Sequence, residues 1–226
     1  GIPWMFAFAM RADGWYLRQD IIWHKPNPMP ESVKDRCTKA HEYMFLFSKN
    51  KKYFYDNEAI KEPAKDWGTR DRTKGKYHNE GTGLQPHSGL SKSYPTKNKR
   101  SVWTITNKPY RGAHFATYPP DLIEPCIKAG SEKGDIILDP FMGIGSTLLG
   151  SMNSGVKSIG LDLNKSYVSL AKKRVKKYQK DLFNEKKVYE PKIICDDANN
   201  LLKYVKKESV DLAITSPPYW NILNQK

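Results

Sequence analysis

Residues 135–147 read DIILDPFMGIGST, an apolar run that ends in an acidic residue and continues into two closely spaced glycines. The apolar part, residues 135–138, predicts a short buried strand, and a helix is expected over residues 147–153. Gly143 and Gly145 let the backbone turn sharply and approach a ligand where a Cβ atom would clash. The stretch lacks the third glycine of a dinucleotide site and the lysine of a phosphate-binding loop, so nucleotide hydrolysis is not expected.

The same alternation of strand and helix continues along the rest of the chain. The apolar pattern predicts further strands at residues 158–161, 192–195 and 210–215, and further helices at residues 165–180 and 199–206. Strands and helices that alternate at this spacing form a parallel sheet with helices on both faces. The predicted fold class is therefore α/β, with a Rossmann-like, doubly wound and mostly parallel sheet.

The N-terminal half of the chain is less regular. Its apolar stretch at residues 2–10 predicts a helix in the core, and residues 17–23 and 42–47 predict strands. Three prolines within residues 25–30 exclude a helix or a central strand there. Residues 62–100 are polar and basic without periodicity, which predicts a long loop or a mobile insertion.

The composition indicates a folded, strongly basic protein. Among 226 residues, 38 are Lys or Arg and 24 are Asp or Glu, a net charge of +14. This surplus favours a polyanionic partner, with nucleic acid as the first candidate and a generally lysine-rich proteome as the alternative. No stretch approaches the roughly 18 apolar residues of a membrane span. Three widely spaced cysteines indicate neither a disulfide framework nor a metal cluster, which favours the cytoplasm.

Acidic residues stand at the ends of three successive predicted strands, where open α/β sheets bind ligands. Asp139 ends the first strand, and a carboxylate there suits a cationic group such as an α-amino group. Asp162 ends the second strand and is placed to accept hydrogen bonds from ribose hydroxyls. Asp196 and Asp197 follow the third strand, where a carboxylate can bind the amine of an adenine. Amine, ribose and adenine together describe S-adenosylmethionine, although each aspartate taken singly could equally cap a helix.

The fourth predicted strand leads into the sequence Ser216-Pro217-Pro218-Tyr219. Two prolines fix the backbone just past the strand end and leave the serine hydroxyl and nearby carbonyls free as acceptors. The tyrosine ring offers a stacking surface. Acceptors for an amine beside an aromatic ring suit a nucleobase extruded from a duplex, because stacking returns about 1–3 kcal/mol of the flipping cost. The structural alternative is a Pro-Pro turn with buried aromatic side chains.

These two motifs together resemble those of the DNA amino-methyltransferases of restriction–modification and phage systems. That family pairs a Phe-x-Gly-x-Gly cofactor loop, here residues 141–145, with a loop of the type Ser-Pro-Pro-Tyr, here residues 216–219. Residues 20–25, 42–49 and 114–119 resemble further family segments. The resemblance implies a class I methyltransferase fold, the cofactor S-adenosylmethionine and double-stranded DNA as the substrate.

The resemblance also implies roles for individual residues. Ser216 and the carbonyl of Pro217 would bond the target amine, within the catalytic loop Ser216, Pro217, Pro218 and Tyr219, while the tyrosine stacks on the base. Methyl transfer would be a direct displacement without a covalent enzyme intermediate. Residues 62–100 correspond to a variable target-recognition region, in which we expect DNA contacts from Arg70, Arg72, Lys97, Lys99 and Arg100. The residues expected to bind the cofactor are Phe115, Asp139, Pro140, Phe141, Gly143, Gly145, Ser146, Thr147, Asp162, Asp196 and Asp197.

The choice of target base rests on the first residue of the catalytic loop. Serine there is commoner in cytosine-N4 enzymes, and aspartate in adenine-N6 enzymes, so we favour N4-cytosine and keep N6-adenine as the alternative. Methylation of cytosine C5 needs a Pro-Cys nucleophile. Cys126 follows a proline but lies in the helix predicted from the Pro119-Pro120 pair to Gly130, so we interpret it as a core residue.

The order of the motifs departs from the family pattern. In the family, a helix and a fifth strand follow the catalytic loop and precede a helix like residues 2–10. The chain therefore corresponds to a circularly permuted relative or to a piece of a longer protein. We divide it into sheet strands and a Pro-rich loop (1–61), a target-recognition region (62–100) and a cofactor-binding and catalytic part (101–226).

Other functions and partners stay open at this point. A non-catalytic DNA-binding fragment, or a methyltransferase acting on RNA or protein, are the rival functions. Besides DNA, a second copy of the chain, a complementary fragment and a cognate restriction endonuclease are conceivable partners, whereas no membrane and no metal are expected.

Overall fold

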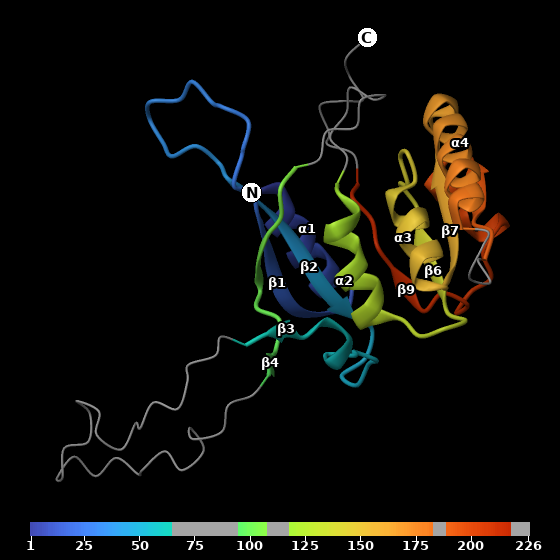
Figure 1. The fold of residues 1–226 in the computed structure, drawn as a ribbon, viewed down its shortest axis with the longest axis horizontal. Helices are drawn as coiled ribbons and strands as arrows, with labels where there is room; N and C mark the ends of the chain where they lie inside the picture. The colour runs from blue at the N-terminus through green and yellow to red at the C-terminus, as the bar shows by residue number, and fades with distance from the viewer. Residues whose placement is uncertain (65–94, 108–117, 183–188, 218–226) are drawn as a thin grey trace.

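The computed structural model describes residues 1–64, 95–107, 118–182 and 189–217 (Figure 1). The part of the chain from residue 136 onward contains a four-stranded parallel sheet with the strand order β8-β7-β6-β9. Parallel strands end at one edge of the sheet, so the residues that follow them gather there. The predicted strands are confirmed, but β9 is two residues long instead of six. The bounds are β6 (Ile136–Asp139), β7 (Lys157–Asp162), β8 (Lys192–Cys195) and β9 (Leu212–Ala213).

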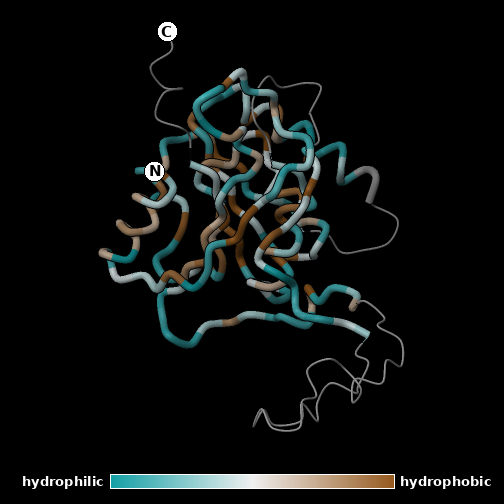
Figure 2. Tube along the Cα trace, turned by 90° about the vertical axis from the view of Figure 1, so that its left-hand side faces the viewer, coloured by the Kyte–Doolittle hydropathy of each residue, from teal (hydrophilic) through white to brown (hydrophobic). Residues whose placement is uncertain are grey.

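Helical segments cover both faces of this sheet, as the alternation predicts. On one face, α3 (Ser146–Ser154) and α4 (Lys165–Leu182) enclose a core of Met142, Leu148, Met152, Val168, Ala171 and Val175. On the other face, Leu138, Leu161, Ile194 and Val205 form a separate cluster near η3 (Ala198–Lys203). η3 is a 3-10 helix and replaces the longer helix predicted over residues 199–206. Figure 2 shows hydrophobic segments in the interior of the fold and hydrophilic ones along its outer loops.

A second sheet has the order β2-β1-β5. β1 (Tyr16–His24) runs antiparallel to β2 (His41–Ser48) and parallel to β5 (Val102–Thr104). The described strands therefore form two separate main sheets rather than one continuous sheet, because neither β9 nor β2 pairs with a strand of the other sheet. Between the two sheets lies α2 (Pro120–Gly130), which contacts both (Figure 1).

The helix α2 has the bounds that the sequence predicts, and its side chains join the two halves. Leu122 packs with Ile21, Trp23 and Trp103 of the second sheet. Ile123 and Ile127 pack instead with Ile137 and Val156 on the parallel sheet. Cys126 lies among these contacts, and burial raises the pKa of its thiol to about 12. A thiol of such high pKa is not a nucleophile at neutral pH, which agrees with its assignment as a core residue.

The N-terminal helix α1 (Ile2–Ala12) has the predicted position, but the prediction that it is a core helix is wrong. Only Ala7 is buried, and Met5 is 70% exposed. The physical reason is that the helix covers a sheet face on one side only. Trp4 packs edge-on against Tyr43 and Phe45 of β2, with ring centroids 5.3 and 5.1 Å apart, and the opposite side of the helix faces outward.

The polar segment 62–100 begins and ends with paired backbone. β3 (Glu62–Pro63) is antiparallel to β4 (Thr96–Lys97), so the two ends of the segment meet. A lack of periodicity could not predict this ribbon, since two-residue strands carry no periodic signal. Among the described residues, no helix is both long and apolar enough to cross a membrane.

Candidate functional site

The loop after β6 is held in a tight turn by its neighbours. Gly143 and Gly145 have φ angles of +52° and +80°, a left-handed backbone that favours glycine. A Cβ atom at position 145 would lie 3.2 Å from that of Ala171 in α4. From the same helix, Arg174 Nη1 donates to the carbonyl of Ile144 at 2.6 Å. The predicted cofactor loop is thus a preformed turn whose backbone lies close against α4.

Asp139 lies under this loop and is fully buried. Its Oδ1 accepts hydrogen bonds from Thr215 Oγ1 (2.9 Å) and the Phe141 amide (3.1 Å). Its Oδ2 accepts from Thr147 Oγ1 (2.6 Å) and the Tyr118 hydroxyl (3.0 Å). Burial raises the pKa of the Asp139 carboxyl, and these hydrogen bonds oppose the rise.

The prediction that Asp139 binds a cationic ligand group directly therefore needs correction. A carboxylate with two donors on each oxygen and no exposed surface has no room for a ligand amine. It connects the loop after β6, the start of α3, the segment before α2 and the end of β9. Ser146 and Thr147 are buried as well, so they support the loop rather than line an open surface, whereas Phe141 is 38% exposed.

Asp162 ends β7 and keeps its capacity to bind a ligand. Its Oδ2 accepts the Gly143 amide at 2.9 Å and its Oδ1 accepts the Asn164 amide at 2.8 Å. Each carboxylate oxygen can accept a second hydrogen bond, and the side chain is partly exposed. Asp162 thus orients the glycine turn and still presents acceptors at the carboxyl edge of the sheet.

The two acids after β8 differ from each other. Asp196 accepts hydrogen bonds from the Tyr204 hydroxyl (2.6 Å), Asn200 Nδ2 (2.8 Å) and the Asp197 amide (2.7 Å). These bonds lower the pKa of the Asp196 carboxyl, and the bond from Tyr204 has the largest effect. Asp197 caps η3 through its Oδ1, which accepts the Asn199 amide at 2.8 Å, while its Oδ2 accepts no hydrogen bond from the described residues. Asp197 is therefore the better candidate for a ligand amine.

The predicted catalytic loop begins next to the predicted cofactor loop. The Ile214 amide donates to the Leu138 carbonyl at 3.0 Å, which aligns the ends of β9 and β6. Thr215 then bonds Asp139, and the next residues, Ser216 and Pro217, are exposed. Sequence reasoning missed the linking roles of Tyr118 and Thr215, although Tyr118 stands in a segment that resembles the family. The predicted site residues Phe115, Pro218 and Tyr219 lie outside the described residues.

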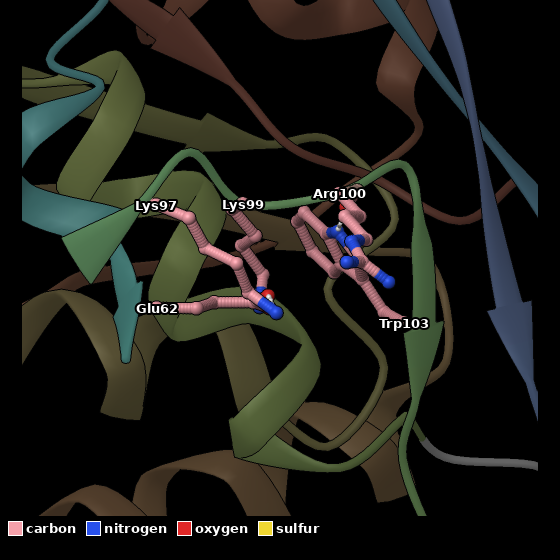
Figure 3. Close-up of polar contacts among 5 residues, drawn as sticks. All are labelled: Glu62, Lys97, Lys99, Arg100 and Trp103. Carbon is pink, nitrogen blue, oxygen red and sulfur yellow. Dashed lines mark hydrogen bonds and ion pairs between the residues drawn. The ribbon is translucent and has the colours of Figure 1, made fainter. Parts of the chain in front are cut away.

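Two of the basic residues predicted to contact DNA, Lys97 and Lys99, have a partner within the protein (Figure 3). Lys99 Nζ lies 3.0 Å from Glu62 Oε1 and 4.8 Å from the centroid of the Trp103 ring. Lys97 Nζ lies 3.9 Å from the other oxygen of Glu62. The single carboxylate thus pairs with both lysines but offsets only one of their two charges, whereas Arg100 is exposed. Arg70 and Arg72 lie outside the described residues.

Residues 3–173 match the model of a protein family described as DNA methylases, of the N6 and N4 type. The chain belongs to this family. Because the match ends before the catalytic loop, it supports the assignment independently of the Ser-Pro-Pro-Tyr motif. The family resemblance drawn from the motifs is therefore confirmed.

Two relatives and one solved structure illustrate the relationship. The chain is 47% identical over 175 residues to the Type II methyltransferase M.XycI of Xanthomonas campestris pv. cyanopsidis, covering 77% of this chain and 49% of that protein. It is 45% identical over 175 residues to M.SmaI of Serratia marcescens, covering 77% and 51%. The chain thus spans about half the length of the curated relatives it matches. The crystal structure of M1.HpyAVI, 24% identical, shares the fold with a TM-score of 0.51 over 74% of this chain and 64% of that one.

Proposed function

We propose that the chain is the cofactor-binding and catalytic part of a DNA methyltransferase that transfers a methyl group from S-adenosylmethionine to the exocyclic amine of a flipped base. The observation that carries the proposal is the shared anchor of the two loops. Thr215 and the amide of Phe141 both donate to Asp139 Oδ1, so the catalytic loop begins directly beside the cofactor loop. Methyl transfer needs the methyl donor and the acceptor amine to be held next to each other, because its catalysis is mostly positioning.

The described residues fit the cofactor. Asp162 and Asp197 hold unused acceptor positions at the ends of neighbouring strands, suited to ribose hydroxyls and an adenine amine respectively. Phe141 offers a partly exposed ring beside the glycine turn. When bound, S-adenosylmethionine supplies an electrophilic methyl group on a sulfonium sulfur. Asp139 holds the loop around that position without contacting the ligand.

The catalytic loop would bind the base amine. Ser216 and Pro217 are exposed residues just past the end of β9, and hydrogen bonds from the amine to Ser216 Oγ and the Pro217 carbonyl would turn its lone pair toward the methyl group. The amine so held would accept the methyl group, the electron pair of the S–C bond would stay on sulfur, and the nitrogen would then lose one proton to water. Serine in the first loop position favours cytosine N4 over adenine N6.

One experiment tests the activity and the base together. The protein is incubated with duplex DNA and S-adenosylmethionine, and the DNA is digested to nucleosides for mass spectrometry. We expect N4-methylcytosine. N6-methyladenine would refute the base assignment and keep the activity, whereas methylation of competing RNA alone, or of no nucleic acid, would refute the function in favour of a rival.

A soluble cytoplasmic enzyme acting on the cell's own DNA is the setting we infer.

Asp162→Ala is expected to weaken S-adenosylmethionine binding by about 1–3 kcal/mol, because ribose hydroxyls and the Gly143 amide lose their acceptor. Calorimetry measures the effect. The matched control is Asp211→Ala, since Asp211 Oδ2 also accepts a backbone amide, that of Ile136 at 2.8 Å, but at the opposite edge of the sheet. Equal affinities of the folded variant and the wild type would remove Asp162 from the site.

A further inference from the structure

The helix α4 carries a row of lysines that form no ion pair with the described residues. Five lysines on it are exposed, and their spacing of three, four and seven residues gathers them on one side of the helix. The opposite side packs Val168, Ala171 and Val175 into the core. We call this set the α4 lysine face; it consists of Lys165, Lys172, Lys173, Lys176 and Lys177.

The helix has one acidic residue, Asp181, which follows the last lysine of this row by four residues. Residues 165–179 contain neither Asp nor Glu, and within the described parts of the chain no ion pair involves the α4 lysine face. Other lysines do have partners: Lys61 pairs with Glu58 at 2.6 Å and Lys128 with Glu124 at 2.7 Å. Like charges four residues apart destabilise a helix, so an unbroken row of them indicates a surface suited to a polyanion.

The first turns of α4 present an open surface that is nearly flat rather than an enclosed cavity. Its polar residues are Lys165, Ser166, Ser169 and Lys173, and ammonium and hydroxyl groups are donors that phosphate oxygens accept. This surface lies at the carboxyl edge of the parallel sheet, because α4 begins three residues after Asp162 ends β7. The start of α4 is therefore at the same edge of the sheet as the ends of β7 and β6, beside which the proposed cofactor and base sites lie (Figure 1).

We propose that the α4 lysine face binds backbone phosphates of the duplex DNA that flanks the target base. The inference rests on the proposed function for its choice of polyanion. The α4 lysine face adds positive charge to that of the predicted contacts, of which Lys97 and Lys99 share one carboxylate, that of Glu62. From Lys165 to Lys176 the helix rises by roughly 17 Å, at about 1.5 Å per residue, enough to follow several phosphates.

The test compares the salt dependence of DNA binding in two charge-matched variants of the full chain. Lys165→Gln with Lys173→Gln removes two charges from the face, and Lys61→Gln with Lys128→Gln removes two that are paired elsewhere. The slope of log affinity against log salt concentration is measured with unmethylated duplex DNA by fluorescence anisotropy. We expect the slope of the first variant to be smaller by about 1.8, at about 0.9 for each phosphate that is no longer neutralised, and the slope of the control to match the wild type.

Further arms separate the outcomes. Lys165→Arg with Lys173→Arg retains both charges and is expected to restore the wild-type slope, and equal melting temperatures exclude misfolding as the cause. Equal slopes for the two glutamine variants would overturn the proposal, as would a change confined to binding of RNA. A slope change in a protein that transfers no methyl group would support the DNA surface while the proposed function fails. Methyl transfer with unchanged slopes would support the proposed function and overturn the role of the α4 lysine face in DNA binding.

Discussion

Asp139→Ala is expected to lower the free energy of unfolding by about 2–4 kcal/mol, because the Thr147 hydroxyl is buried and the Tyr118 hydroxyl lies in the interior, and both lose a charged acceptor. The loss stays below the sum of four bonds, since one of the two freed hydroxyls can then donate to the other, whose oxygen lies 2.6 Å away. Chemical denaturation measures the change. Asp135→Ala is the control, because Asp135 accepts one amide, that of Glu132, near the surface; we expect a change below about 1 kcal/mol there.

The single-donor variants Tyr118→Phe and Thr215→Val show whether the two hydroxyls act through the same carboxylate. If they do, their effects on unfolding are not additive, because each removes a bond to one shared acceptor. A loss under about 1 kcal/mol for Asp139→Ala would mean that water satisfies the remaining donors. The carboxylate would then not be the anchor of the two loops.

The sequence could predict that these aspartates lie at the carboxyl edge of the sheet. It could not predict which of them is buried and which can bind a ligand. Strand periodicity and the glycine turn place Asp139, Asp162 and Asp197 at successive strand ends. They do not reveal that Thr215, 76 residues away from Asp139, completes the shell around that carboxylate. Burial of a charged side chain depends on donors from distant segments, which local patterns do not contain.

The absence of distant contacts from local sequence patterns also explains the other differences between the predictions and the structure. Residues 2–10 have the composition of a core helix, but the sequence does not state that α1 covers one side of an aromatic strand and leaves its other side exposed. Charge counts favour Lys99 as a DNA contact, yet the β3–β4 ribbon brings Glu62, 37 residues earlier, within 3.0 Å of it. For the lysines of α4 the local sequence is sufficient, because no acidic residue lies among them between residues 165 and 177.

Ser216→Ala is expected to slow methyl transfer about a hundredfold while the affinities for S-adenosylmethionine and DNA stay nearly unchanged. The hydroxyl lies exposed at the end of β9 and makes no hydrogen bond to the described residues, so its removal costs the fold little. Its proposed contact with the amine strengthens as the nitrogen loses electron density in the transition state, and such a contact affects kcat rather than binding. Single-turnover kinetics with labelled methyl groups, beside calorimetry of both ligands, measures the two effects separately.

The matched control is Ser209→Ala, which removes an exposed hydroxyl that donates to the Lys206 carbonyl before β9 rather than after it. Its transfer rate should equal that of the wild type. Ser216→Thr keeps the acceptor and should recover much of the lost rate, which a merely structural role for the side chain would not require. If Ser216→Ala methylates at the wild-type rate, the Pro217 carbonyl alone holds the amine, and the preference for cytosine loses its basis in the first residue of the loop.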